Sequence, residues 1–126
     1  MYAINEIDSA ELAAWQADGK DFILLDVRTP NEIFQGIIPG GVGLPLNQIP
    51  YQVEQLPKDS PVVFYCRTGA RSAQATAFLM ARGFSNAHNL RGGIMDWARQ
   101  GGTIVAPEPS MMQEMMGQSA PVTAAR

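Results

Sequence analysis

Residues 61–83 read PVVFYCRTGARSAQATAFLMARG, and the fold can be worked out from this stretch outward. Its first five residues form an unbroken apolar run, which is typical of a strand buried on both faces of a parallel sheet. Residues 72–82 have a helical composition, and Gly83 is placed to end that helix. A buried strand that leads through a short loop into a helix is the building unit of parallel α/β proteins.

The rest of the chain continues this alternation of short apolar runs and helical patterns. The predicted strands are 22–26, 61–65 and 87–90, and the predicted helices are 8–18, 29–36, 72–82 and 94–100. Two of the helices begin at an N-cap residue with Glu three positions later. Residues 36–50 are rich in Gly and Pro, so we expect a shaped loop there, with a turn of helix near 46–51. The pattern predicts one α/β domain over residues 1–106.

Size and charge exclude several classes of protein. The chain has 126 residues, 46% of them hydrophobic, which is enough for one core. Its net charge is −3 and its nine Lys and Arg residues are scattered, so no nucleic-acid partner is expected. It begins without a basic, apolar leader and contains no apolar run of bilayer length, which favours a soluble, cytoplasmic protein with no membrane partner.

Residues 107–126 differ in character from the rest of the chain and contain four methionines between Ser110 and Gly117. Ser110 and Gln113 have the spacing of a capping box, so a two-turn helix ending at Gly117 is predicted. The simplest interpretation of this Met-rich tail is a frayed end or a segment folded back onto the domain. The alternative is a docking helix for a partner or for self-association.

Cys66 is the only cysteine and His88 the only histidine. An internal disulfide, a Cys-x-x-Cys redox pair and a cysteine-rich zinc site are therefore excluded, and the carboxylates form no close cluster. We expect no metal and no cofactor. His88 has no partner motif that places it against Cys66, so a structural role is expected for it.

Cys66 follows a buried strand and precedes a helix, which is where parallel α/β sheets bind anions. An ordinary thiol is only about 3% ionised at pH 7, and a helix dipole contributes only about 0.3–1 kcal/mol. Further stabilisation of a thiolate is expected from the guanidinium groups of Arg67 and Arg71 and from backbone N–H groups of the loop that contains Gly69 and Ala70. Such a pocket suits a thiolate, a persulfide and a small dianion such as thiosulfate.

These residues resemble the rhodanese family, whose active loop has this length and starts with the catalytic cysteine. The other matching segments are Leu25-Asp26-Val27-Arg28 with Glu32, Gly36 to Gly41 with Leu44-Pro45, and Leu90-Arg91-Gly92-Gly93 with Trp97. They span roughly residues 4–101 in the family's order. The resemblance implies a rhodanese-like α/β fold, with a parallel sheet of about five strands and helices on both faces.

The resemblance also implies a thiosulfate sulfurtransferase that works by a ping-pong mechanism through a Cys66 persulfide. The donor would be thiosulfate or a persulfide or polysulfide, and the acceptor a thiol, cyanide or a protein cysteine. The implied site comprises catalytic Cys66, substrate-binding Arg67, Thr68, Gly69, Ala70 and Arg71, and supporting Asp26, Arg28 and Ser72. The sequence departs from the family at Ile37, where His is frequent, and at Gly41, where Ala is usual. Ile37 is expected to make the rim of the site more apolar.

Several alternatives stay open at the level of sequence. A cysteine phosphatase or arsenate reductase also places Cys and Arg around an oxyanion loop, but with five residues between them, whereas Cys66 and Arg71 enclose four. A rhodanese-like module could instead bind a partner without catalysis. Arg71 could bond to backbone carbonyls and hold the loop closed. Asp26, Arg28 and Glu32 are expected to form a local ion pair that fixes the first crossover, and Asp26 could also orient the Cys66 loop.

Overall fold

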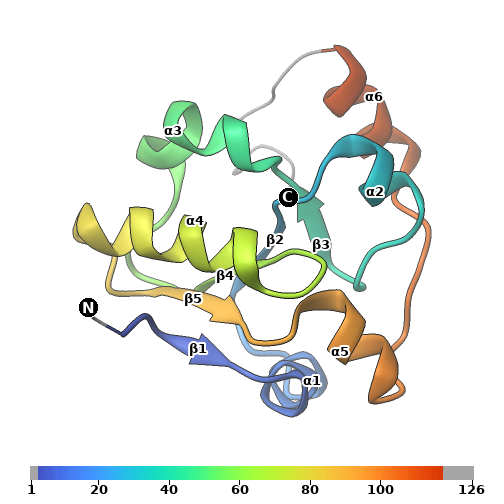
Figure 1. Cartoon of the computed structure of the whole chain (residues 1–126), viewed down its shortest axis with the longest axis horizontal. Helices are drawn as coiled ribbons and strands as arrows, with labels where there is room; N and C mark the ends of the chain where they lie inside the picture. Colours follow the sequence, from blue (N-terminus) through green and yellow to red (C-terminus); the bar gives the residue numbers. More distant parts are fainter. Residues whose placement is uncertain (1–2, 118–126) are drawn as a thin grey trace.

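The computed structural model describes residues 3–117 and has a single sheet at its centre (Figure 1). All five strands are parallel, in the order β1-β5-β4-β2-β3. The strands are β1 (Glu6–Ile7), β2 (Ile23–Asp26), β3 (Gly41–Gly43), β4 (Val62–Tyr65) and β5 (Ala87–Leu90). The helices are α1 (Ser9–Ala17), α2 (Pro30–Phe34), α3 (Ile49–Gln52), α4 (Ala70–Ala81), α5 (Gly93–Arg99) and α6 (Pro109–Gly117), with 3-10 turns η1 (Leu46–Gln48) and η2 (Val53–Gln55). The expected five-stranded parallel α/β fold is confirmed.

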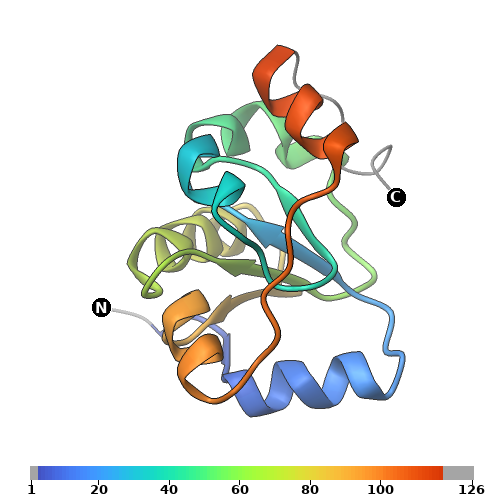
Figure 2. The same cartoon turned by 90° about the vertical axis from the view of Figure 1, so that its right-hand side faces the viewer.

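Helices cover both faces of the sheet, which explains why its strands are apolar throughout. Helices α3 and α4 lie on one face, and α1 and α5 lie on the other (Figures 1 and 2). Along β2, Leu25 packs with the α4 residue Leu79, while its neighbour Leu24 packs on the opposite face with Leu12 of α1. Successive side chains of a strand point to opposite faces, so a strand between two helical layers needs an apolar residue at every position.

The helix caps predicted from sequence are present, but two strands were missed. Asp8 and Thr29 form capping boxes at α1 and α2, as their spacing indicated. Helix α4 begins at Ala70 rather than at residue 72, because Gly69 serves as its N-cap with φ 107° and without a side-chain hydrogen bond. The strands β1 and β3 have two and three residues, which is too short for a hydrophobic pattern. Residues 36–50 are therefore not all loop.

The segment that follows α5 crosses the molecule and is attached at two points. Trp97 donates from Nε1 to the carbonyl oxygen of Thr103, and Ile37 and Val105 exchange backbone hydrogen bonds of 2.8 and 2.9 Å. The predicted tail helix is present as α6, which lies against α2 and β3 (Figure 2).

Ile37 is only 4% exposed, so the expectation that it lines an apolar rim is wrong: its backbone bridge to Val105 places it in the interior. Within residues 3–117, every helix is too short or too polar to traverse a bilayer.

Tyr65, the last residue of β4, explains why Gly41 departs from the family pattern. Its buried hydroxyl accepts a hydrogen bond of 3.1 Å from the backbone N–H of Ile38. A Cβ atom on Gly41 would lie 2.8 Å from this hydroxyl and 3.0 Å from the Ile38 carbonyl oxygen. The tyrosine hydroxyl therefore takes up the space that an alanine side chain would need.

Replacing Gly41 with Ala is expected to lower the free energy of unfolding by about 1–3 kcal/mol, because the added methyl group overpacks this contact. Part of that loss should disappear when the same change is made in a Tyr65→Phe protein, which lacks the hydroxyl. Urea denaturation of the two single variants and the double variant measures this coupling. Additive losses would contradict the steric explanation.

Candidate active site

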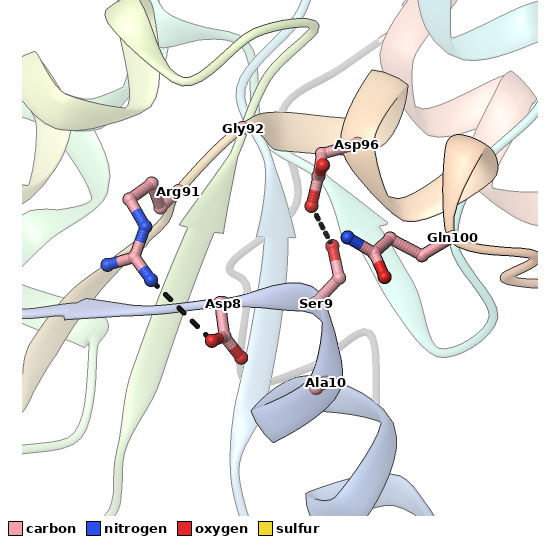
Figure 3. Close-up of a pocket in the computed structure, with 7 residues that line it drawn as sticks. All are labelled: Asp8, Ser9, Ala10, Arg91, Gly92, Asp96 and Gln100. Atoms are coloured by element: carbon pink, nitrogen blue, oxygen red, sulfur yellow. Dashed lines mark hydrogen bonds and ion pairs between the residues drawn. The ribbon is translucent and has the colours of Figure 1, made fainter.

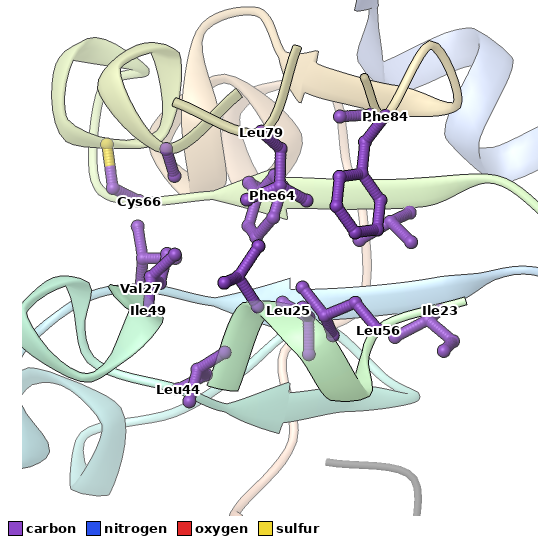
Figure 4. Close-up of a cluster of buried hydrophobic side chains, with 14 residues drawn as sticks. Ile23, Leu25, Val27, Leu44, Ile49, Leu56, Phe64, Cys66, Leu79 and Phe84 are labelled. Carbon is purple, nitrogen blue, oxygen red and sulfur yellow. The ribbon is translucent and has the colours of Figure 1, made fainter. Parts of the chain in front are cut away.

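Cys66 lies directly after β4, the middle strand of the sheet, where the chain turns toward α4. It is only 1% exposed and belongs to the same buried cluster as Val27 and Ile49 (Figure 4). The sulfur is therefore held at the end of the core by packing from two other segments. The thiol is therefore almost fully covered from solvent.

The loop surrounds the Cys66 sulfur with hydrogen-bond donors. The backbone N–H of Gly69 lies 3.1 Å from Sγ and the hydroxyl of Ser72 lies 3.4 Å from it. Burial opposes ionisation of the thiol, but hydrogen bonds from the Ser72 side chain and from the backbone N–H groups of Ser72, Gly69 and Thr68 outweigh it, so the pKa of Cys66 is lowered. The thiolate expected from the sequence thus has a physical basis, and the contacts to Sγ come from hydrogen-bond donors rather than guanidinium groups.

The first turn of α5 fixes the other side of this loop. The N–H groups of Ile94 and Met95 donate to the carbonyl oxygens of Cys66 and Arg67 at 2.9 and 3.0 Å. Gly93 has φ 62°, and a Cβ atom there would lie 2.4 Å from the Arg67 carbonyl oxygen. Since these carbonyls are engaged by α5, the loop can turn its N–H groups toward sulfur. The Gly92-Gly93 pair belongs to a segment that resembles the rhodanese family, but nothing in the sequence placed it against Cys66.

A polar pocket of about 310 Å³ lies where α1 meets the start of α5 (Figure 3). In it, the Ser9 hydroxyl donates to Asp96 at 2.9 Å, and Arg91 lies 3.5 Å from the Asp8 carboxylate. These polar groups bind one another across the two helices. These contacts therefore attach α1 to α5, the helix whose first turn holds the active loop.

Asp26 and Arg28 form the buried ion pair that was expected at the first crossover. Arg28 contacts Asp26 through Nε and Nη2, at 2.9 and 2.6 Å, and donates to the Gly36 carbonyl oxygen at 2.7 Å. Glu32 is not part of this group, which corrects the expectation. Its carboxylate forms a two-point ion pair with Arg71 in the first turn of α4, at 2.7 and 2.9 Å. Arg71 therefore contacts a carboxylate rather than the loop carbonyls.

The remaining loop residues differ in exposure. Arg67, Thr68 and Ala70 are exposed at the mouth of the site, whereas Gly69 is buried beneath it. Within residues 3–113, whose side chains the structure describes, Arg67 has no carboxylate partner, so its guanidinium is available to an anion. The assignment of these residues to substrate binding stays a prediction.

His88 is structural, as expected: Nδ1 lies 2.9 Å from the Asn86 carbonyl oxygen, and its ring packs edge-on against Trp15.

Replacing Ser72 with Ala should raise the pKa of Cys66, because it removes the side-chain donor that most strongly favours the thiolate. The pH midpoint for alkylation by iodoacetamide should move upward, and the rate near neutral pH should fall. Ser85→Ala, an exposed serine outside the loop, is the control. An unchanged midpoint in Ser72→Ala would show that this hydroxyl does not stabilise the thiolate.

Comparison with known proteins tests the resemblance seen in the sequence. Residues 8–100 match the family model of the rhodanese-like domain. A sulfurtransferase of Allochromatium vinosum is 54% identical over 105 residues, which are 83% of this chain and 98% of that protein. The crystal structure of a rhodanese-related protein from Thermoplasma volcanium has a TM-score of 0.71 and 29% identity, covering 80% of this chain and 97% of that one. A rhodanese-like domain protein from Staphylococcus aureus has a TM-score of 0.70 and 31% identity, covering 75% and 91%. The chain therefore belongs to the rhodanese-like domain family.

Proposed function

We propose that the chain is a sulfurtransferase that carries sulfane sulfur as a persulfide on Cys66, taken from thiosulfate or from a persulfide or polysulfide donor. The observation that carries this proposal is the environment of Sγ. A buried thiol with a lowered pKa lies 3.1 Å from the Gly69 N–H and 3.4 Å from the Ser72 hydroxyl. The same donors suit the terminal sulfur anion of a persulfide, since it carries the same single charge.

The reaction proceeds in two steps with no external oxidant. The Cys66 thiolate attacks the outer sulfur of thiosulfate, a new S–S bond forms, and the old S–S bond breaks with its electron pair leaving on sulfite. An acceptor such as cyanide, a small thiol or a protein cysteine then attacks the outer sulfur and releases the Cys66 thiolate. Because Cys66 is the only cysteine, the persulfide has no internal thiol with which to form a disulfide. A reducing compartment such as the cytoplasm suits this chemistry.

Two other functions are less well supported by the site. A cysteine phosphatase or arsenate reductase would need the larger loop with five residues before its arginine, and Arg71 is already paired with Glu32. A non-catalytic binding module has no use for a thiol of lowered pKa. Hydrolysis of an aryl phosphate at an enzyme-like rate, lost in Cys66→Ser, would favour the phosphatase.

The purified protein should gain one sulfur atom, about 32 Da, when it is incubated with thiosulfate or a polysulfide, as covalent catalysis requires. Cyanide should remove that sulfur as thiocyanate. Intact-mass measurement and a thiocyanate assay follow the two steps, with Cys66→Ser as the control. If no sulfur is loaded from thiosulfate, polysulfide or mercaptopyruvate, the proposal is wrong.

Residues 107–126 are our candidate for docking a protein acceptor or a second copy of the chain. Helix α6 lies against α2, which carries Glu32 beside the active loop, so this segment begins near the site. Deleting residues 107–126 should slow sulfur transfer to a protein thiol or reduce self-association, while transfer to cyanide is kept. Kinetic assays and light scattering measure these effects. An unchanged rate together with an unchanged molar mass would remove the docking role.

A further inference from the structure

The charges around the Cys66 loop are largely balanced within the protein. Three arginines lie near the loop, and two of them are matched by carboxylates: Arg28 by Asp26 at 2.6 Å and Arg71 by Glu32 at 2.7 Å. Arg67 alone has no carboxylate partner in the described part of the chain. The site therefore offers a donor one uncompensated positive charge, in addition to its N–H groups.

Glu32 holds its charge at any pH at which the protein would be assayed. Hydrogen bonding from Arg71 lowers the pKa of Glu32 to about 2, and further bonds from Thr29 act in the same direction. Arg71 in turn has its pKa raised by Glu32 and, to a smaller extent, by the Cys66 charge. Arg71 is thus within electrostatic range of the reacting sulfur, and the carboxylate bonded to it must also act on a charged donor.

A cleft of about 380 Å³ lies beside Arg71, between the start of α2 and η1. Its walls are mainly apolar, formed by Val27, Pro30, Pro45 and Leu46 together with the side chains of Arg28, Thr29, Asn47 and Arg71. Val27 also packs in the same cluster as Cys66, so one residue of the cleft wall belongs to the core that surrounds the reacting cysteine. The walls of the cleft suit a hydrocarbon group better than a second anionic oxygen.

We propose that Glu32 makes the site selective for singly charged organic donors of sulfane sulfur, such as organic persulfide or thiosulfonate anions, over dianionic thiosulfate. This inference rests on the proposed sulfurtransferase function and names its preferred donor class. Glu32 acts through Arg71, so it is a specificity-determining residue and not a catalytic one. The organic group of the donor occupies the apolar cleft beside Arg71, and its sulfur anion lies toward Arg67 and the loop N–H groups.

Thiosulfate and methanethiosulfonate form a matched pair of probes for this selectivity. On the same tetrahedral sulfur, thiosulfate carries an anionic oxygen where methanethiosulfonate carries a methyl group. With either one, the Cys66 thiolate attacks the outer sulfur, the S–S bond of the donor breaks, and its electron pair leaves on sulfite or on methanesulfinate. Both reactions give the same Cys66 persulfide and conserve charge. The ratio of kcat/KM for the two donors therefore reports the response of the site to one unit of charge.

Replacing Glu32 with Gln should raise the ratio of kcat/KM for thiosulfate to that for methanethiosulfonate by about threefold to tenfold, the size expected for two unit charges about 4 Å apart in water-like surroundings. Replacing Arg71 with Gln should shift the ratio the other way, because Glu32 then stands unpaired. Both shifts should shrink in high salt. Glu11→Gln is the matched control, since Glu11 caps α1 as Glu32 caps α2 but has no contact with the loop.

Damage to the fold would lower both rates together and leave their ratio unchanged, so opposite shifts in the two variants cannot come from loss of structure. An unchanged ratio in Glu32→Gln overturns the role of Glu32, even if Cys66 loads normally. If wild-type Cys66 loads from polysulfide but from neither probe, the donor preference is wrong while the proposed function stands. If it loads from neither probe, nor from polysulfide or mercaptopyruvate, the proposed function itself fails. The two failures are therefore distinguishable.

The cleft is tested with benzenethiosulfonate, which has the same charge as methanethiosulfonate and a larger apolar group. Wild-type protein should favour the benzene compound by kcat/KM, and Leu46→Ser should reduce that preference, because Leu46 lines the cleft. The ratio for each protein cancels any loss of folded material. Equal preference in the wild-type and Leu46→Ser proteins would exclude the cleft as the site of the organic group.

Discussion

The active loop depends on two backbone hydrogen bonds that come from another part of the chain. The first turn of α5 donates to the carbonyl oxygens of Cys66 and Arg67, and Gly93 lets that turn approach closely enough to do so. A peptide group whose oxygen is engaged on one side has its N–H directed elsewhere. The Arg67 carbonyl shares its peptide group with the N–H of Thr68, and that N–H, like the N–H of Gly69, bonds to the Cys66 sulfur and lowers the pKa of the thiol. The polar contact between Ser9 and Asp96 secures α5 against α1. The position of the loop therefore depends on α1 and α5 as well as on α4, the helix into which it leads.

Hydrogen bonding and charge have separate roles in this site. Donors in the loop stabilise the thiolate at short range, where the low local dielectric makes each bond effective. The guanidinium groups act at longer range and are partly cancelled by carboxylates of the first crossover. The hydrogen bonds to the Cys66 sulfur and the ion pairs beside the loop are therefore made by different residues. A substitution at Glu32 removes no hydrogen bond from the sulfur, and one at Ser72 removes no ion pair.

Much of this arrangement could be predicted from sequence, because it depends on local patterns. The capping boxes at Asp8 and Thr29 and the apolar strand before Cys66 are features of neighbouring residues. The missed features join residues far apart in the chain. The pairing of Arg71 with Glu32 spans 39 positions, and the bridge between Ile37 and Val105 gives no side-chain pattern at all. A close contact such as that of Tyr65 with Gly41 can be found only in the three-dimensional structure.

The burial of Cys66 has a consequence for encounters between whole proteins. A disulfide needs the two Cα atoms within about 7 Å, and a thiol that is 1% exposed at the base of a loop does not admit a second folded surface so closely. A persulfide on the same residue would extend the reactive atom outward by one S–S bond, about 2 Å. The unloaded protein is thereby shielded from covalent capture by other proteins, and carrying sulfur would itself bring the reactive atom closer to where a second protein can reach it.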